Sequence, residues 1–229
     1  ASGACDIDLT NITKVSGQFV ASQGCANAGI YTNTWTVKDD CGNTSNTFTQ
    51  IITIQDTTAP IFTGDLPLDI EVSCDAVPEP AEMHVSDNCN EDIPIVYSET
   101  KSGIENDCPS NYTLTRTWKI SDCGGNTTTH VQIITVRDKT APTGTAPESV
   151  TNVASIDAIP AGSPSDIKDA ADNCSPTVNI TFVDTNNGGN GCDGAPYILT
   201  RTYTLTDCAG NKTELDQTFT VESKVTVSG

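Results

Sequence analysis

Ten cysteines give this chain its main capacity for covalent chemistry. Cysteines bind metal ions when they occur as close pairs such as Cys-x-x-Cys, and they form disulfides when they are spread through an extracellular domain. The shortest spacings here are 15 to 16 residues, as between Cys74 and Cys89, and no Cys-x-x-Cys pair occurs. The spacing therefore predicts disulfides and an extracellular, cell-surface setting.

Acid–base and nucleophilic chemistry has few candidates in this sequence. The two histidines, His84 and His130, lie outside any metal-binding or catalytic motif, and we expect both to be surface strand residues. The chain contains no G-x-S-x-G, H-E-x-x-H or P-loop sequence. We therefore expect no catalytic residue and no enzyme activity.

Net charge narrows the possible partners. Acidic residues outnumber basic ones 30 to 11, which gives a formal charge of −19 over 229 residues. Nucleic acids and anionic membranes are bound mainly through Lys and Arg, so this balance argues against both. We also expect no membrane insertion, because no run of 18 apolar residues occurs.

The elements that would position the cysteines and carboxylates recur along the chain. Trp35, Trp118 and Tyr203 each open a segment that leads into a D-x-x-G-N turn, and the Asp residues of these turns lie 83 and 85 positions apart. Self-similarity of this kind predicts tandem domains. We distinguish repeat one (1–59), an incomplete repeat with the back half of a sandwich, repeat two (60–142), which is complete, and repeat three (143–229), which includes a C-terminal tail.

Each repeat is predicted to be an all-β sandwich. Residues 112–120 alternate between large side chains and Thr or Lys, which is typical of a half-buried antiparallel strand, and residues 197–205 repeat the pattern. Short strands and frequent turns in a unit of about 80 residues indicate tandem immunoglobulin-like sandwiches with disulfides. Arg116 and Arg201 fall on the apolar face of this strand, where we expect structural side chains with a packed stem and a head that is either paired or reaches solvent.

The directions of the strands predict which cysteines meet. In repeat two we expect strands at 67–73, 81–87, 93–100, 111–121 and 127–137. Antiparallel neighbours then place Cys89 and Cys123 at one end of the sandwich and Cys74 and Cys108 at the other, close enough to bond. The predicted disulfides are Cys74–Cys108 and Cys89–Cys123 and, at the equivalent positions of the other repeats, Cys5–Cys41 and Cys174–Cys208.

Two cysteines, Cys25 and Cys192, have no partner in this scheme. Ile156 stands where the partner of Cys192 would be, so we expect Cys25 and Cys192 to be unpaired or intermolecular. A competing scheme pairs Cys174 with Cys192 and leaves Cys208 without a partner.

Carboxylates gather where one repeat leads into the next. The Asp of the linker enters the end of the following repeat that also carries the D-N-C loop and the D-x-x-G-N turn. Clustered carboxylate and amide oxygens can bind Ca²⁺, although Asp and Asn also favour turns without any ion. The candidate calcium ligands are Asp56, Asp87, Asn88, Asp92 and Asp122 at the first junction, and Asp138, Asp172, Asn173 and Asp207 at the second.

The string Y-T-L-T-R-T-W-K-I-S-D-C-G-G-N (112–126), the preceding D-N-C (87–89) and the closing D-x-T-A-P (138–142) resemble a known repeat type. It is the HYR-like, immunoglobulin-like tandem repeat of large Bacteroidetes cell-surface proteins, including SprB-like gliding-motility adhesins secreted by the type IX route. The resemblance implies an adhesive or structural role, with neighbouring repeats of one longer chain as partners. It also implies a sugar-attachment site at Thr57, because Asp56-Thr57-Thr58 resembles the O-glycosylation signal of these bacteria.

Two functions fit these observations. The first is a structural stalk or filament segment of an extracellular surface adhesin. The second is a calcium-dependent module that itself binds a glycan or a protein, for which the Gly- and Asn-rich loop 186–191 is the candidate surface. Self-assembly of several chains, and completion of repeat one by its own or another chain, stay open.

Overall fold

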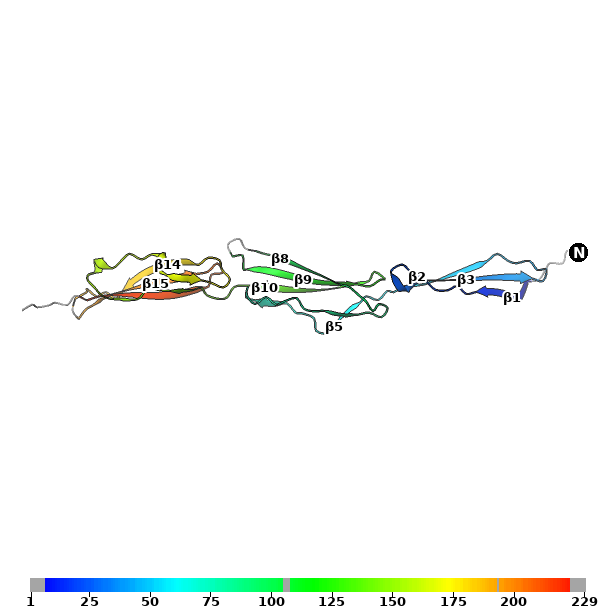
Figure 1. Cartoon of the computed structure of the whole chain (residues 1–229), viewed down its shortest axis with the longest axis horizontal. Helices are drawn as coiled ribbons and strands as arrows, with labels where there is room; N and C mark the ends of the chain where they lie inside the picture. Colours follow the sequence, from blue (N-terminus) through cyan, green and yellow to red (C-terminus); the bar gives the residue numbers. More distant parts are fainter. Residues whose placement is uncertain (1–6, 105–107, 193, 223–229) are drawn as a thin grey trace, which may run out of the picture. The chain divides into compact units, whose positions relative to one another are not determined.

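The computed structural model describes residues 7–104, 108–192 and 194–222, and the regular secondary structure of these residues is almost entirely β-strand (Figure 1). Besides strands β1 to β16, they contain two short 3-10 turns, η1 (Ile156–Ala158) and η2 (Pro164–Asp166). The predicted all-β class is confirmed. In this part of the chain, no helix has the length and apolar character needed to cross a membrane.

Repeat two contains two sheets. The larger has the order β6 (Ile70–Val72), β10 (Thr127–Val136), β9 (Tyr112–Ser121), β8 (Ile95–Ser102), and β6 pairs in parallel with β10. The smaller joins β5 (Ile61–Thr63) to β7 (His84–Ser86) in antiparallel fashion. Each of the five strands predicted for this repeat overlaps an observed strand.

Repeat three has the same arrangement. Its larger sheet has the order β12 (Val150–Val153), β16 (Lys212–Val221), β15 (Tyr197–Thr206), β14 (Asn179–Asn186), again with a parallel pair, β12 and β16. The smaller pairs β11 (Thr143–Thr145) with β13 (Lys168–Ala171). Repeats two and three are thus tandem sandwich-like domains of one design, as predicted.

Repeat one forms a single sheet within the described residues. The long strand β3 (Cys25–Asp39) pairs with β1 (Ile7–Val15), β2 (Val20–Ser22) and β4 (Phe48–Ile54), all antiparallel. Strand β4 is exposed along its whole length, and Ile51 on it is 63% exposed. The described part of repeat one therefore has no second sheet to cover these apolar side chains.

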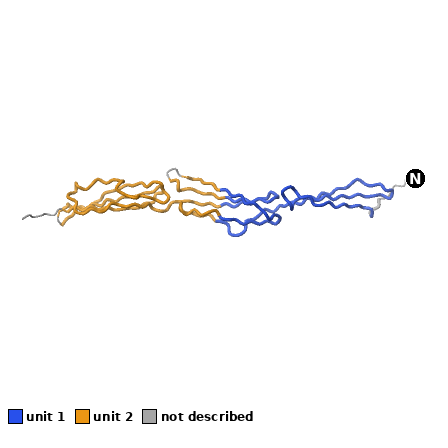
Figure 2. Tube along the Cα trace, in the orientation of Figure 1, with its two compact units in different colours: residues 1–67, 81–98, 117–131 blue, residues 68–80, 99–116, 132–229 orange. Residues whose placement is uncertain are grey.

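The chain divides into two compact units (Figure 2). Unit one comprises residues 1–67, 81–98 and 117–131, and unit two comprises residues 68–80, 99–116 and 132–229. The division passes through strands β8, β9 and β10 of repeat two. The disulfides and carboxylate clusters described below each lie within one unit.

The core confirms the period of two predicted for the central strand of each sandwich. In β9, Leu114, Arg116, Trp118 and Ile120 are buried, and in β15 the buried positions are Arg201, Tyr203 and Leu205. The two arginines are ion-paired, as expected. Arg116 donates to a Glu99 carboxylate oxygen at 2.8 Å, and Arg201 donates to both oxygens of Asp184 at 2.7 and 2.8 Å.

Candidate functional site

Three disulfides join described cysteines, and each connects one repeat to the next. Their Cα–Cα distances are 5.1, 5.8 and 5.0 Å, and their sequence separations are 98, 100 and 100 residues. The bonded pairs are Cys25–Cys123, Cys74–Cys174 and Cys108–Cys208. Two of the three therefore connect repeats two and three.

These bonds correct the pairing predicted from the sequence. The within-repeat disulfides Cys74–Cys108, Cys89–Cys123 and Cys174–Cys208 are wrong, and so is the competing pair Cys174–Cys192. The prediction that Cys74 and Cys108 lie at the same end of repeat two is right, since both of them bond into repeat three. The strand argument failed because it considered one repeat alone, whereas a short linker brings cysteines of the next repeat within bonding distance of the same end.

The cysteines that were predicted to lack a partner, and those not yet assigned, divide into three cases. Cys25 is bonded, so the expectation that it lacks a partner is also wrong. Cys89 and Cys192 are free thiols, and Cys192 is exposed. The predicted pair Cys5–Cys41 includes Cys5, which lies outside the described residues, whereas Cys41 is disulfide-bonded.

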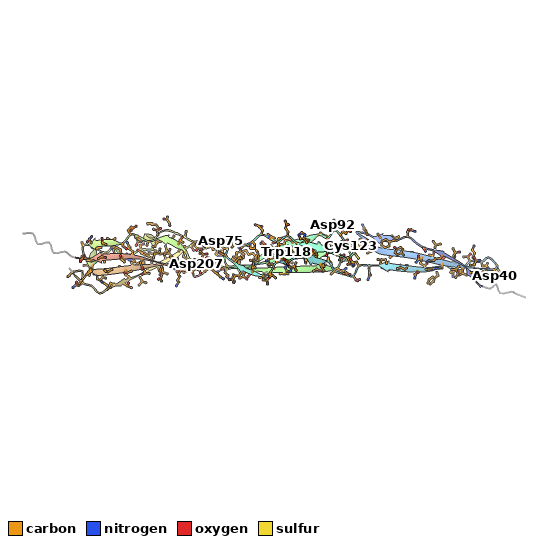
Figure 3. The ribbon with its side chains drawn as sticks, turned by 90° about the horizontal axis from the view of Figure 1, so that it is seen from below. Asp40, Asp75, Asp92, Trp118, Cys123 and Asp207 are labelled. Atoms are coloured by element: carbon orange, nitrogen blue, oxygen red, sulfur yellow. A yellow bond between two sulfur atoms is a disulfide. The ribbon has the colours of Figure 1, made fainter. Side chains whose placement is uncertain are left out.

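Three carboxylates converge where repeat two enters repeat three. Asp138 lies in the linker after β10, Asp172 in the D-N-C loop after β13, and Asp207 in the turn between β15 and β16 (Asp207 is labelled in Figure 3). One oxygen from each lies within 4.8 Å of the others. Asp138 and Asp207 are only 5% and 6% exposed. We call this cluster the second trio.

Each carboxylate of the second trio is held by the backbone of its own loop. Asp138 Oδ1 accepts from the Thr140 amide at 3.0 Å, and Asp172 Oδ1 accepts from the amides of Cys174 and Ser175 at 2.8 and 2.6 Å. The Oδ2 atoms of Asp138 and Asp172 are buried and have no hydrogen-bond partner. The loops therefore fix only one oxygen of Asp138 and of Asp172.

The same arrangement recurs where repeat one enters repeat two. Asp56, Asp87 and Asp122 form the first trio, again with ligand-type oxygens within 4.8 Å of one another. Asp56 Oδ1 accepts from the Thr58 amide and Asp87 Oδ1 from the amides of Cys89 and Asn90. The Oδ2 atoms of Asp56 and Asp87 are buried without a partner, as in the second trio.

Six of the nine candidate calcium ligands thus fall into two carboxylate clusters, while the two asparagines and Asp92 have other surroundings. Asn88 donates to Cys89 Sγ, and Asn173 donates to Asp75 Oδ2 at 3.1 Å. Asp92 is exposed and belongs to neither trio (Figure 3). Thr57, the candidate sugar acceptor, is exposed in the first linker, and its modification stays a prediction.

Sequence reasoning missed the Asn of the D-x-x-G-N turn. Asn211 Nδ2 donates to Asp207 Oδ2 at 2.7 Å and to the Asp138 carbonyl at 3.2 Å, and its amide donates to Asp207 Oδ1. Asn126 makes the equivalent bonds to Asp122 and to the Asp56 carbonyl. This residue therefore orients the turn carboxylate and ties the linker to it. The constant spacing of four residues from Asp to Asn was the available signal.

The acidities of the clustered carboxyls differ for physical reasons. Burial, and then the negative charges of Asp172 and Asp207, raise the pKa of Asp138. Burial would also raise the pKa of Asp122, but the hydrogen bonds from the Asn126 side chain and from turn amides lower it overall. Ionising Asp138, the linker carboxylate of the second trio, therefore costs free energy because it lies among like charges.

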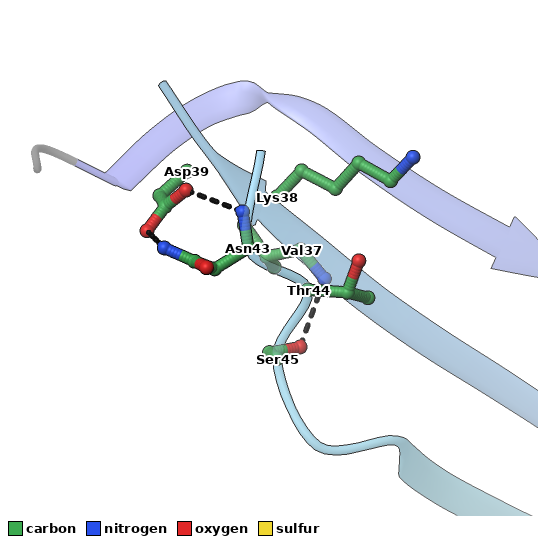
Figure 4. Close-up of a pocket in the computed structure, with 6 residues that line it drawn as sticks. All are labelled: Val37, Lys38, Asp39, Asn43, Thr44 and Ser45. Atoms are coloured by element: carbon green, nitrogen blue, oxygen red, sulfur yellow. Dashed lines mark hydrogen bonds between the residues drawn. The ribbon is translucent and has the colours of Figure 1, made fainter. Parts of the chain in front are cut away.

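Repeat one carries the same turn outside any trio. Asp39 accepts from the Asn43 amide at 2.7 Å and from its side chain at 2.8 Å, beside a recess of about 320 Å³ lined by Val37 and Ser45 (Figure 4). Gly3 occupies the sequence position that Asp87 and Asp172 hold in the other repeats. The Asp–Asn turn is thus a folding element by itself, and among the residues that the structure describes two of its three copies belong to a carboxylate cluster.

Both histidines lie on strands, as predicted, His130 on β10 and His84 on β7. His130 lies with its ring 5.8 Å from that of Trp118 and 6.3 Å from that of Phe62, and its Nε2 is 2.9 Å from the Pro67 carbonyl. The other histidine, His84, is exposed on β7. Among the described residues, neither histidine takes part in a cluster of metal-ligand type.

Comparison with known proteins identifies the repeat. The family described as "HYR-like domain with 4 cysteines" matches residues 62–136 and 143–221. No curated protein matches the chain. Among solved structures, Drosophila N-cadherin EC1-4 is 13% identical with a TM-score of 0.31, and the match covers 91% of this chain and 66% of that one. The human desmocollin-1 ectodomain is 13% identical with a TM-score of 0.30, and the match covers 84% of this chain and 47% of that one. The chain thus spans about two thirds and about half of these relatives. Because the family matches most of its length, the chain belongs to the HYR-like domains with four cysteines and carries two copies in tandem.

Proposed function

We propose that this chain is a structural segment of an extracellular surface adhesin, a stalk or filament whose consecutive repeats are covalently fastened to one another. The observation that carries the proposal is the set of inter-repeat disulfides. Each bond starts in one repeat and ends in the next, at almost constant sequence separation. A protein that must keep its domains in register under load gains from such bonds.

The disulfides shorten the covalent path through the chain. Through the disulfides that join described cysteines, a short path from Ala1 to Gly229 runs to Cys25, crosses to Cys123, returns to Cys108, crosses to Cys208 and continues to the end. It includes roughly 60 residues, or about 20 nm at full extension, against roughly 230 residues and about 80 nm without disulfides. Tension on the termini therefore bypasses most of the folded residues.

Location and partners follow from the same features. Disulfides persist in oxidising compartments, so they support an extracellular site for the protein. The net charge of −19 disfavours nucleic acids as partners and keeps neighbouring chains apart in solution. The first partners are the neighbouring repeats of the same chain, and the resemblance to SprB-like repeats supports a large cell-surface protein as the parent.

Pulling single molecules by their termini tests this function. The oxidised chain is expected to reach a contour length of about 20 nm, and the same chain in reductant is expected to reach about 80 nm. The variant Cys192→Ser, which removes a free thiol, is the control and should extend like the unmodified protein. Equal contour lengths with and without reductant overturn the proposal.

A calcium-dependent glycan- or protein-binding module is the alternative, and the loop 186–191 is its candidate surface. In the structure, hydrogen bonds of the loop's own Asn187 hold its conformation. Asn187 accepts from the amides of Gly189 and Ile198 and donates to the Pro196 carbonyl at 3.0 Å. A glycan array with the oxidised chain distinguishes the two functions, since specific signal that disappears with chelator would favour the binding module.

A further inference from the structure

We propose that each carboxylate trio is a Ca²⁺ site that fastens the linker to the repeat that follows it. The ligands are Asp56, Asp87 and Asp122 in the first site and Asp138, Asp172 and Asp207 in the second. The inference rests on the carboxylate geometry alone, so it stands or falls independently of the proposed structural role.

The unpartnered oxygens are the observation that points to an ion. Asp138 is 5% exposed, its Oδ2 has no hydrogen-bond partner, and one of its carboxylate oxygens lies within 4.8 Å of oxygens from two further carboxylates. A buried polar atom without a partner is costly, and a buried charge without a counterion is more so. The Oδ2 atoms of Asp172, Asp56 and Asp87 are likewise buried without a hydrogen-bond partner.

Among the described residues, no Lys or Arg forms an ion pair with these oxygens. In the described part of the chain, the ion pairs of Lys and Arg go to Glu71, Glu99 and Asp184, none of which belongs to a trio. Lys139 follows Asp138 directly but pairs with Glu71. Three converging carboxylates without a protein cation match the charge requirement of a bound divalent ion.

Turn formation explains the position of only one oxygen of Asp138 and of Asp172. Asp is common in loops because one side-chain oxygen accepts from backbone amides two or three residues on. The Oδ1 atoms of Asp138 and Asp172 do this. It gives no reason for the second oxygen of each residue to be buried without a hydrogen-bond partner.

The donor set indicates calcium among the metals. All three side chains offer hard carboxylate oxygens, and the second site has no His or thiol to attract zinc or copper. Two oxygens on opposite sides of a Ca²⁺ ion, bound at about 2.3–2.6 Å, are about 5 Å apart, so oxygens that lie within 4.8 Å of one another can share one Ca²⁺ ion. Mg²⁺ is usually bound by one or two carboxylates and keeps several waters, so three converging carboxylates favour Ca²⁺.

A third group of potential ligands does not form a site. Cys74, Asp75 and Cys174 also lie close together, but the two sulfurs are bonded to each other and cannot act as thiolate ligands. The proposal is therefore limited to the two trios.

Calorimetric titration of the 229-residue oxidised protein with CaCl₂, after chelator treatment, tests the proposal. We expect two bound ions and a rise of about 5–10 °C in Tm at saturation. Asp138→Asn and Asp172→Asn should each abolish one of the two sites, and Asp56→Asn the other. Asp92→Asn is the matched control, because Asp92 is an exposed acidic residue outside the trios and should leave both sites intact.

The chelated proteins provide a second test. Asp138→Asn removes a charge from a buried like-charged cluster, so its Tm in chelator should exceed that of the unmodified protein. A variant that merely failed to fold would show a lower Tm. The proposal is overturned by absence of calcium binding, by two sites surviving in Asp138→Asn, or by an equal rise in Tm with Mg²⁺.

Discussion

Cys108 in repeat two is bonded to Cys208 in repeat three, 100 residues later, with their Cα atoms 5.0 Å apart. Cys74 and Cys174 form a second bond at the same junction. These repeats are therefore held together by two covalent bonds in addition to the main chain, and unfolding of either repeat cannot separate them.

The double variant Cys108→Ser/Cys208→Ser should lower the free energy of unfolding by about 4 kcal/mol, because it releases a long closed loop in the unfolded chain. Urea unfolding followed by Trp fluorescence measures the change. Cys192→Ser, at an exposed free thiol, should alter the free energy by less than about 0.5 kcal/mol. A loss of equal size in both proteins would contradict the assigned pairing.

The chain-entropy cost of a loop also explains why the sequence could not reveal the partners. Closing a loop of about 100 residues costs only about 1 kcal/mol more than closing one of about 35. The strand pattern correctly placed Cys74 and Cys108 at one end of repeat two, but entropy hardly distinguishes a partner in the same repeat from one in the next. The packing of one repeat against another decides which cysteines pair, and a pattern within a single repeat contains no information about that packing.

The carboxylate clusters were more predictable than the disulfides. Asp138, Asp172 and Asp207 sit in three turn motifs whose positions follow from strand direction alone, so the sequence could bring them to one end. It could not show that Asn173 faces Asp75 while Asn211 bonds to Asp207. Side-chain direction within a turn depends on backbone dihedral angles that the motif does not specify.

The ion pair of Arg201 should contribute strongly to the stability of repeat three. Its side chain is 3% exposed, and Asp184→Ala would remove the ion pair of this buried guanidinium while its hydrogen bond to the Pro160 carbonyl remains. We expect a loss of about 2–3 kcal/mol, measured by urea unfolding. Glu214→Ala on the neighbouring strand β16 is the control, because Glu214 is exposed and should change the free energy little. Equal small effects would show that Arg201 does not depend on Asp184.

Acid should weaken repeat three through Asp166. The hydrogen bond from the Ser163 amide, and then that from the Tyr203 hydroxyl, lower the pKa of Asp166. Because the folded pKa lies below the unfolded value of about 4, this carboxylate stabilises the fold above pH 4 and loses that effect as the pH falls further. The free energy gap between the unmodified protein and Asp166→Asn should therefore be largest near pH 7 and shrink below pH 4.

Unfolding by urea at several pH values between 3 and 7 measures that gap. Asp157→Asn, at an exposed residue of the neighbouring turn η1, is the control. A gap for Asp166→Asn that stays constant across this range would contradict the role assigned to the ionised carboxylate.

The loop before Cys192 should be intolerant of side chains at Gly189. A Cβ there would lie 2.0 Å from the Pro196 carbonyl oxygen, which is backbone and cannot rotate away. We expect Gly189→Ala to lower the free energy of unfolding by about 2 kcal/mol or more, since the loop must separate from the segment leading into β15. Gly188→Ala is the control. Gly188 has a positive φ of 73° but open space around it, so its cost should be limited to about 1 kcal/mol of backbone strain. If Gly189→Ala proved as mild as Gly188→Ala, the loop would be adaptable, and a ligand-binding role for it would gain support over a fixed connection between strands.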